Sequence, residues 1–441
     1  MRNALLFLIA TTSAGSAAQA ADLLQVYRDA VTHDAQFASA RAARDASLER
    51  LPQGRAGLLP IVSLSANTTW NDQDVSFRGS TTFAGGKRQY NSHGYTVTLS
   101  QPLFRWQNWI QYDQAKLQVA QAEATLSNAR QDLVLRVAQA YFDVLLAQDA
   151  LAFAQAQKKA IGEQLEQAKR NFEVGTSTIV DTHEAQARFD LTTAQEIAAQ
   201  NDLEVKRHAL RQIIGREPEA LKPLRQDVQI QQPRPAEMQK WVESAEGNSF
   251  VVQVQQAALD IATKEVERNR AGHYPTLDLV ATHGKNTQGS SSQGIGSDST
   301  TNTIGLQLAV PIYQGGLVMS REREAVALRE KALQDLETTR RTTALSARQA
   351  YLGVTSGMAQ VKALEAGLVS SLSALDSNKL GYEVGVRINI DVLNAQQQVF
   401  QTRRDLAKAR YDTLLSQLRL NAAAGQLGEE DVKQINGLLE P

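Results

Sequence analysis

The chain has 441 residues, and its 46 Lys and Arg residues against 47 Asp and Glu residues give a formal net charge of −1 at pH 7. This balance argues against a nucleic acid partner, because phosphate binding needs a surplus of basic side chains. The sequence contains no cysteine, which excludes both a disulfide framework and a lipidated N-terminal cysteine.

The first element in chain order is a predicted secretory signal peptide at residues 1–21. Arg2 precedes the apolar run Ala4–Ala10, and small residues follow up to an A-x-A pattern at Ala18–Ala20. The mature chain has no run of 18 or more apolar residues. Any crossing of a membrane must therefore be made by strands.

Most of the remaining chain consists of two copies of one structural pattern, about 210 residues apart. Glu-Val-Gly followed by Asp occurs at Glu173–Asp181 and again at Glu383–Asp391. This period is too long for a solenoid repeat of roughly 20–50 residues and indicates a duplicated half. The predicted segments are a signal peptide at 1–21, a first repeat at 22–214 with a β-hairpin at 60–102 and a coiled-coil hairpin at 105–214, a proline-rich equatorial linker at 215–235, a second repeat at 236–425 with a β-hairpin at 275–311 and a coiled-coil hairpin at 315–423, and a C-terminal tail at 426–441.

Each half contains two predicted strands in which apolar and polar residues alternate. The apolar positions are Val62, Leu64, Ala66 and Trp70, then Tyr95, Val97 and Leu99, then Leu277, Leu279 and Ala281, and finally Ile304, Leu306, Leu308 and Val310. Each strand has about 10 residues, the length that a tilted strand needs to cross a bilayer. We expect polar loops at Asn71–Ser92 and Asn286–Thr303 to join them at an outer surface. Two ordinary hairpins packed on helices remain an alternative from this pattern alone.

A long helix is predicted from Trp106 to Phe172, because no proline interrupts this segment. Its second half carries a heptad stripe at Val137, Ala140, Val144, Ala147, Leu151, Ala154, Lys158, Ile161, Leu165, Ala168 and Phe172. The stripe returns in the second half at Ala347, Ala350, Val354, Gly357, Val361, Leu364, Leu368, Ser371, Leu375, Asn378 and Tyr382. Such spacing makes helices supercoil around each other. Each half thus predicts an antiparallel coiled-coil hairpin with its tip at Glu173–Ser177 or Glu383–Arg387.

Four strands cannot close a barrel, and an open sheet leaves unpaired backbone groups facing lipid. Closure therefore requires several copies of the chain. Two copies give eight strands, whose interior the side chains fill, whereas three copies give twelve strands and an open lumen. The sequence predicts a duct.

These features resemble the TolC family of outer-membrane efflux and secretion channels, from about Asp22 to Gly425. The motifs that carry the resemblance are RAGHYPTLDL at Arg270–Leu279, VPIYQGG at Val310–Gly316 and YEVGVRINIDVL at Tyr382–Leu393. The resemblance implies a mixed α and β membrane protein of the cell outer membrane that extends into the periplasm. It also implies a homotrimer, with a 12-stranded barrel to which each protomer gives four strands, continued by a periplasmic α-helical coiled-coil barrel.

The implied function is that of an exit duct in a tripartite efflux pump or a type I secretion system. The implied partners are a periplasmic adaptor (membrane fusion) protein and an inner-membrane pump or ABC exporter. By resemblance, the adaptor contacts the hairpin tips at Gly175 and Gly385, with Val174 and Val384 beside them. Both glycines are also expected as tight-turn residues.

The resemblance also implies a gate at the periplasmic tip. Asp391 matches an aspartate of a constricting ring, Tyr382 and Arg387 match latch residues, and Asp181 matches the carboxylate that the latch bonds. One turn after Asp391, where a second acid is usual, the chain has Asn394, and Glu184 stands at the corresponding place of the first repeat. From the residues alone, Asp391 also fits a capping acid near a helix start.

Enzyme and metal chemistry find little support in the sequence. His183-Glu184 begins a zinc motif, but Ala187 stands where the second histidine belongs. With six scattered histidines and no cysteine, we expect no metal site, and we expect no cofactor. The serious alternative to a duct is a soluble periplasmic coiled-coil adaptor or scaffold protein.

Overall fold

The structure is a computed structural model that describes residues 20–79, 82, 85–218, 220–225, 227–291 and 295–440. Residues 1–19, which make up most of the predicted signal peptide, lie outside the described residues. The chain divides into two compact units. The sheet unit comprises residues 42–126 and 251–339, and the helical unit comprises the described parts of residues 1–41, 127–250 and 340–441.

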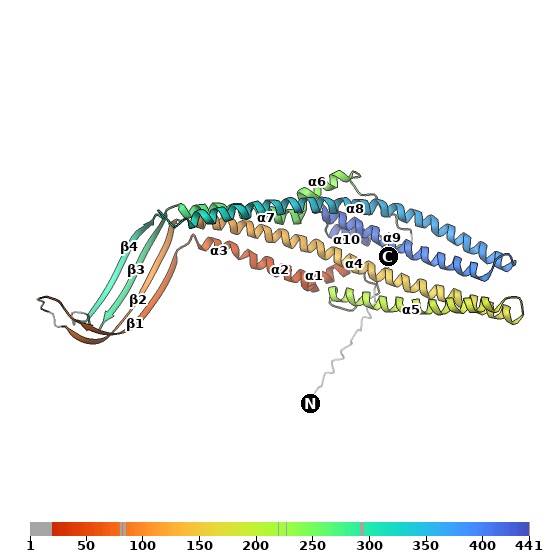
Figure 1. Cartoon of the computed structure of the whole chain (residues 1–441), viewed down its shortest axis with the longest axis horizontal. Helices are drawn as coiled ribbons and strands as arrows, with labels where there is room; N and C mark the ends of the chain where they lie inside the picture. Colours follow the sequence, from red (N-terminus) through yellow and green to blue (C-terminus); the bar gives the residue numbers. More distant parts are fainter. Residues whose placement is uncertain are drawn as a thin grey trace, which may run out of the picture. The chain divides into compact units, whose positions relative to one another are not determined.

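The sheet unit holds one antiparallel sheet with the strand order β1-β2-β3-β4 (Figure 1). The strands are β1 (Ile61–Val75), β2 (Gly86–Phe104), β3 (Thr276–Gln288) and β4 (Ser297–Ala309). The four predicted strands are confirmed, and the two hairpins pair with each other through β2 and β3. In the described part of the chain, β1 and β4 each pair on one side only, so the sheet has two open edges.

The strand register gathers the predicted apolar residues on one face of the sheet. On this apolar face, Val62, Leu99, Ala281 and Ile304 lie side by side across the four strands. Their neighbours along the strands point to the opposite face, where Ser63, Thr98, Thr282 and Thr303 form a polar row. In the single chain the apolar side chains of β1 and β4 are exposed, Leu64 by 70% and Ile304 by 77%, while Leu99 of β2 and Ala281 of β3 are half-buried. One apolar and one polar face is the alternation that a membrane barrel requires.

The strands run further than the sequence predicted. The predicted loops at Asn71–Ser92 and Asn286–Thr303 are too long, because β1 continues to Val75 and β4 begins at Ser297. Polar bonds accompany the added pairs: Asn71 Nδ2 donates to Ser92 Oγ at 2.9 Å. Backbone pairing does not depend on apolar side chains, so the ladder continues after the apolar pattern has ended.

An ion pair holds the end of the sheet from which the chain enters the next helix. Arg105 donates from Nε and Nη2 to the two carboxylate oxygens of Asp278, at 2.8 and 2.7 Å. Asp278 is only 6% exposed, and the register of β2 against β3 shifts beside it, between Pro102 and Phe104. A carboxylate this buried needs a bidentate partner, so the pair fixes the place where β2 ends.

The helices fall into three groups. Within the helical unit lie α1 (Leu23–His33), α5 (Ile179–Ile214), α6 (Met238–Asn248), α9 (Asn389–Ala423) and α10 (Glu429–Asn436); within the sheet unit lie α3 (Arg50–Ala56) and the 3-10 turn η1 (Ala271–His273); and α2 (Ala35–Leu48), α4 (Trp106–Glu173), α7 (Phe250–Arg270) and α8 (Leu317–Glu383) contribute residues to both. Among the described residues, no helix combines the length and the apolar character needed to cross a membrane.

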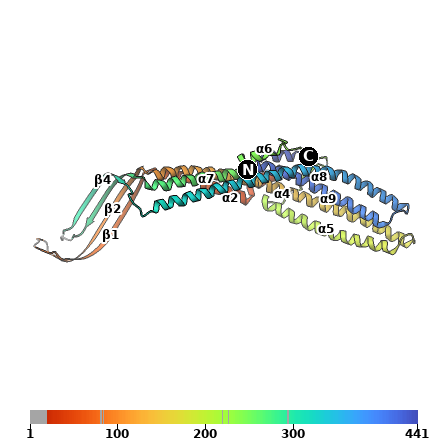
Figure 2. The same cartoon turned by 45° about the horizontal axis from the view of Figure 1, so that its top comes forward.

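The predicted heptad stripe forms the packed seam of the helical unit, where α4 lies beside α5 and α8 beside α9 (Figures 1 and 2). Buried members of the seam are Val137, Val144, Ala147, Ile161, Leu165 and Ala168 on α4, and Ala347, Val354, Val361 and Leu375 on α8. Lys158, the charged residue in the stripe of α4, donates to Glu196 of α5 at 2.8 Å. Its ammonium group also lies 5.8 Å from the centre of the Phe189 ring. The lysine therefore joins α4 to α5 without leaving its charge unpaired.

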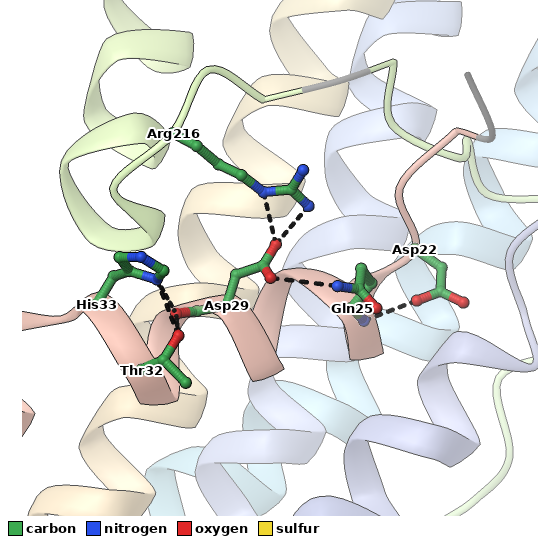
Figure 3. Close-up of polar contacts among 6 residues, drawn as sticks. All are labelled: Asp22, Gln25, Asp29, Thr32, His33 and Arg216. Atoms are coloured by element: carbon green, nitrogen blue, oxygen red, sulfur yellow. Dashed lines mark hydrogen bonds and ion pairs between the residues drawn. The ribbon is translucent and has the colours of Figure 1, made fainter. Parts of the chain in front are cut away.

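The segment after α5 is tied to α1 (Figure 3). Arg216 donates from Nε and Nη2 to Asp29 Oδ2, at 2.9 and 2.6 Å. Gly215 ends α5 with a φ of 74°, and a Cβ atom there would approach His33 to 2.9 Å. The start of the predicted linker at 215–235 is thus anchored to α1.

The C-terminal segment is structured, although the sequence suggested only a polar tail. It forms α10, on which Val432 and Ile435 are buried. Leu439 then pairs with Leu224 in an antiparallel bridge, and Asn436 Nδ2 donates to Asp22 at 3.1 Å. Two buried residues in one short helix are too few for a sequence pattern to identify.

Candidate functional site

The two hairpin tips of the helical unit have the same backbone geometry. Gly175 and Gly385 have φ angles of 77° and 78°, in the left-handed region that favours glycine. Gly175 N donates to Phe172 O at 3.0 Å, and Gly385 N donates to Tyr382 O at 3.1 Å. The predicted tip residues beside them are strongly exposed, Val174 by 74% and Val384 by 65%.

Asp181 caps the helix that follows the first tip. Its Oδ2 accepts hydrogen bonds from the backbone N and the hydroxyl of Thr178, at 3.0 and 2.9 Å, and from Ser177 Oγ at 2.9 Å. The Thr178 hydroxyl accepts from Asp181 N, which completes a capping box. Burial opposes the charge of Asp181, but the bonds from Thr178 and Ser177 outweigh it and lower the pKa of the carboxyl.

Asp391 stands at the corresponding place of the second tip and has no such cap. The hydroxyl residues that hold Asp181 are replaced by Arg387 and Ile388, and no side chain caps the start of α9. Asp391 instead lies 3.6 Å from Arg387 Nη1, with 34% of its side chain exposed. The carboxylate of Asp391 therefore takes no part in a capping box like that of Asp181.

Among the described residues of one chain, Tyr382 has no hydrogen bond with Asp181. Its hydroxyl accepts a hydrogen bond from Asn171 Nδ2 of α4 at 3.1 Å. Arg387 likewise bonds Asp391 within its own tip, while Asp181 is occupied by its capping partners. The structure thus brings Arg387 and Asp391 together, and pairs Tyr382 with a residue that the sequence did not single out.

Asn394 and Glu184 also differ in their surroundings. Asn394 Oδ1 accepts a hydrogen bond from Arg188 Nη2 of α5 at 2.9 Å, and Arg188 Nη1 donates to Gln397 at 2.6 Å. Glu184 is half-buried on α5, one turn after Asp181, and its side chain has no hydrogen bond or ion pair with any other described residue. Asn394 therefore takes part in a hydrogen bond between α5 and α9, whereas the side chain of Glu184 makes no such link between helices.

Two further residues near the tips escaped the sequence analysis. Gln164 of α4 donates from Nε2 to Asn389 Oδ1 at 2.7 Å, and the two are only 8% and 1% exposed. Asn389 Nδ2 is buried without a partner among the described residues. Gln164 adjoins Leu165 of the predicted seam, but the heptad pattern gives no signal that pairs it with Asn389.

An apolar cluster lies behind these polar links and joins the two hairpins. Its buried members are Ile161, Leu165 and Ala168 of α4, Ala185 of α5 and Leu393 of α9, with Phe189 and Ile390 packed against them. Leu393 is 1% exposed and lies between Asp391 and Asn394 in the sequence. Its packing in this cluster therefore fixes the position of the first turns of α9.

The site contains no recognisable metal centre. In the part of the chain that the structure describes, no three His, Asp or Glu side chains gather as ligands. The charged and amide side chains at the tips can attract or repel ions and can link helices, and these are the chemical actions open to them.

A family model described as "Outer membrane efflux protein" matches residues 26–216 and 241–426 of the chain. The chain is 34% identical over 427 residues to "Outer membrane protein TolC" of Vibrio cholerae, with 96% of this chain and 95% of that protein covered. It is 33% identical over 441 residues to "Proteases secretion protein PrtF" of Dickeya chrysanthemi, with 98% and 94% covered.

The fold has a solved counterpart. The CmeC outer membrane channel of Campylobacter jejuni superposes with a TM-score of 0.81 and covers 95% of this chain and 90% of that chain. The two sequences are 17% identical in the superposition, so this likeness concerns the fold. It agrees with the mixed helix and sheet architecture expected from the sequence.

Proposed function

Since the chain belongs to the outer membrane efflux protein family, we propose that it is the gated exit duct of a tripartite efflux pump, a type I secretion system, or both. The protein is located in the cell outer membrane and extends into the periplasm. A duct that opens to the exterior passes small molecules or proteins delivered by other machinery and needs no catalytic site of its own. The observation that carries the proposal is a sheet with one exposed apolar face and two open edges.

The duct is closed by three copies of the chain. Unpaired backbone groups at the edges of β1 and β4 would cost several kcal/mol each in lipid, so the edges must pair with those of other copies. Three copies supply twelve strands, enough for an open lumen, whereas eight strands would be filled by side chains. The helical hairpins of the copies then continue the barrel into the periplasm.

The two halves of the chain are structural repeats that follow a signal peptide at 1–21. The lengths of their helices support this division: α4 has 68 residues and α8 has 67, while α5 has 36 and α9 has 35. The first repeat spans 22–214 and the second 236–425, with the linker 215–235 between them and the tail 426–441 after them.

The energy and the choice of cargo come from partners. The exposed valines at Val174 and Val384, beside Gly175 and Gly385, are the contacts for a periplasmic adaptor protein. Through this adaptor the duct is joined to an inner-membrane pump or ABC exporter. A relative named for protease secretion supports the inclusion of proteins among the cargo.

The gate is a ring of Asp391 carboxylates, one from each copy, that attracts cations at the periplasmic constriction. The absence of a side-chain cap at the start of α9 supports this assignment, because Asp391 is held only by a loose ion pair with Arg387, at 3.6 Å, and can still attract cations. Tyr382 with Asn171, and Arg387 with Asp391, act as the latch that keeps the constriction narrow. Glu184 is a candidate for additional negative charge there.

Conductance in planar lipid bilayers tests the duct. We expect the detergent-purified protein to migrate as a heat-modifiable trimer and to give discrete single-channel steps. The rival, a soluble periplasmic adaptor or scaffold, predicts extraction without detergent and an unchanged bilayer current. A water-soluble monomer that inserts no channels would refute the duct.

A further inference from the structure

Arg188 makes a contact between two helices that the proposed gate does not explain. Its two terminal nitrogens reach across from α5 to α9, to Gln397 at 2.6 Å and to Asn394 at 2.9 Å. Residues 394 and 397 are three apart and face the same side of α9, so one planar guanidinium can bond both. Arg188 therefore joins the first hairpin to the second at the level of Asn394.

Among the residues that the structure describes, Arg188 has no ion-pair partner, even though an acid is near in sequence. Glu184 lies four residues earlier on α5, the spacing at which Glu and Arg ordinarily pair along a helix. Within the described residues, however, the guanidinium bonds only the two neutral amides of α9. A full positive charge thus lies beside position 394, which is one turn after Asp391.

We propose that Arg188 is a positioning residue that clamps α5 to α9 and also sets the charge of the constriction. This inference rests on the proposed gate at Asp391. Because of Arg188, a carboxylate at position 394 would form an ion pair instead of adding an unpaired negative charge. The neutral residue at position 394 and the cationic Arg188 thus belong together, because an acid at position 394 would be neutralised by Arg188.

A double-mutant cycle tests the charge role. Asn394→Asp, Arg188→Gln and the double variant are compared with the unchanged protein in planar bilayers, with a trivalent cobalt hexaammine cation as the blocker. We expect Asn394→Asp alone to change the blocking constant less than about twofold, and the double variant to strengthen block about tenfold, because only there is the new charge unpaired. A tenfold gain from Asn394→Asp with Arg188 still in place would overturn the proposal.

Two further variants separate the clamp from the charge. In the Asn394→Asp background, Arg188→Lys keeps the positive charge but cannot form the two-pronged bond, so block should stay weak. Arg404→Gln is the matched control, because Arg404 lines the same groove between α5 and α9 but bonds Gln401 of its own helix. Both Arg404→Gln and Arg188→Gln are compared in the Asn394→Asp background. An equal strengthening of block by the two variants would also overturn the proposal.

Thermal unfolding gives a readout that does not depend on conductance. Asn394→Asp should raise the apparent Tm by about 1–3 °C through the new ion pair, and Arg188→Gln should abolish that gain. No coupling between the two positions would refute the contact whether or not the protein forms channels. If the coupling is found but no channel is, the proposed function fails and the clamp remains.

Discussion

The two hairpin tips share one backbone turn, but they use their aspartates differently. In the first tip Asp181 is held by Thr178 and Ser177 and caps α5. In the second tip the corresponding positions are Ile388 and Arg387, so Asp391 has no hydroxyl to bind and α9 starts without a side-chain cap.

The difference shows that the two repeats stabilise their helix starts differently, which leaves Asp391 available for the proposed ring. A helix N-terminus gains about 1 kcal/mol from a good cap. The second tip lacks this stabilisation and keeps a carboxylate that is only loosely paired, 3.6 Å from Arg387. Two residue changes beside an unchanged turn are enough to alter the role of the acid.

Removal of the second aspartate should have the largest effect. Asp391→Ala is expected to weaken block by multivalent cations about tenfold, because the ring loses all its charges. Single-channel titration with the trivalent blocker measures the change. Asp181→Ala is the matched control and should leave block nearly unchanged; unaltered block in Asp391→Ala would remove Asp391 from the gate.

Removal of the first aspartate should act on stability instead. Asp181→Ala should cost about 1 kcal/mol through the loss of the capping box, measured as a lower unfolding temperature at pH 7. The pKa of Asp181 is lowered in the fold, so its contribution is present above the ordinary carboxyl pKa and is lost as the pH falls through the folded value. The gap between the variant and the unchanged protein should therefore close in acid. A gap that persists or widens there would contradict the capping role.

A cap built into the second tip should make the two tips alike. Ile388 has φ and ψ of −100° and 159°, close to −90° and 156° for Thr178, so Ile388→Thr fits the backbone. We expect a gain of up to about 1 kcal/mol in stability. Block should also weaken, since Asp391 would turn toward its own helix start. Ile388→Val is the control for shape, and a Thr variant with unchanged block would show that capping does not compete with the ring.

Release of the latch should have the smallest effect of the four. Tyr382→Phe combined with Arg387→Ser removes one half-buried hydrogen bond, of roughly 0.5–1.5 kcal/mol, and one exposed ion pair, of about 1 kcal/mol at most. We expect conductance to rise by about twofold. Asn171→Ala should add little to the effect of Tyr382→Phe if the two form one contact. A silent double variant would leave the latch without support.

The sequence predicted the periodic parts of the molecule well. Alternation identified all four strands, and the heptad stripe identified the buried seam, because both patterns record which side of an element is covered. Strand ends were missed, since the pairing of Asn71 with Tyr90 continues where the apolar pattern has stopped. Periodicity does not register polar pairs of this kind.

The site was predicted only in part. Gly175 and Gly385 lie at the expected turns, since glycine signals a positive φ in the sequence itself. The partner of Tyr382 was not predictable, because the contact with Asn171 depends on how α4 and α8 are rotated against each other. The same holds for Arg188, whose partners lie more than 200 residues away. The capping difference, in contrast, can be read from Ser177-Thr178 and Arg387-Ile388.

The open edges of β1 and β4 also constrain how the protein is made. The edge strands of a single exported copy have no partner strand within the described residues, and their unpaired backbone groups can pair with any other strand. Closure of the duct by three copies, as proposed, therefore requires that subunit assembly accompany or precede entry into the bilayer. Biogenesis then becomes concentration-dependent, and copies that meet too slowly are substrates for chaperones or proteases.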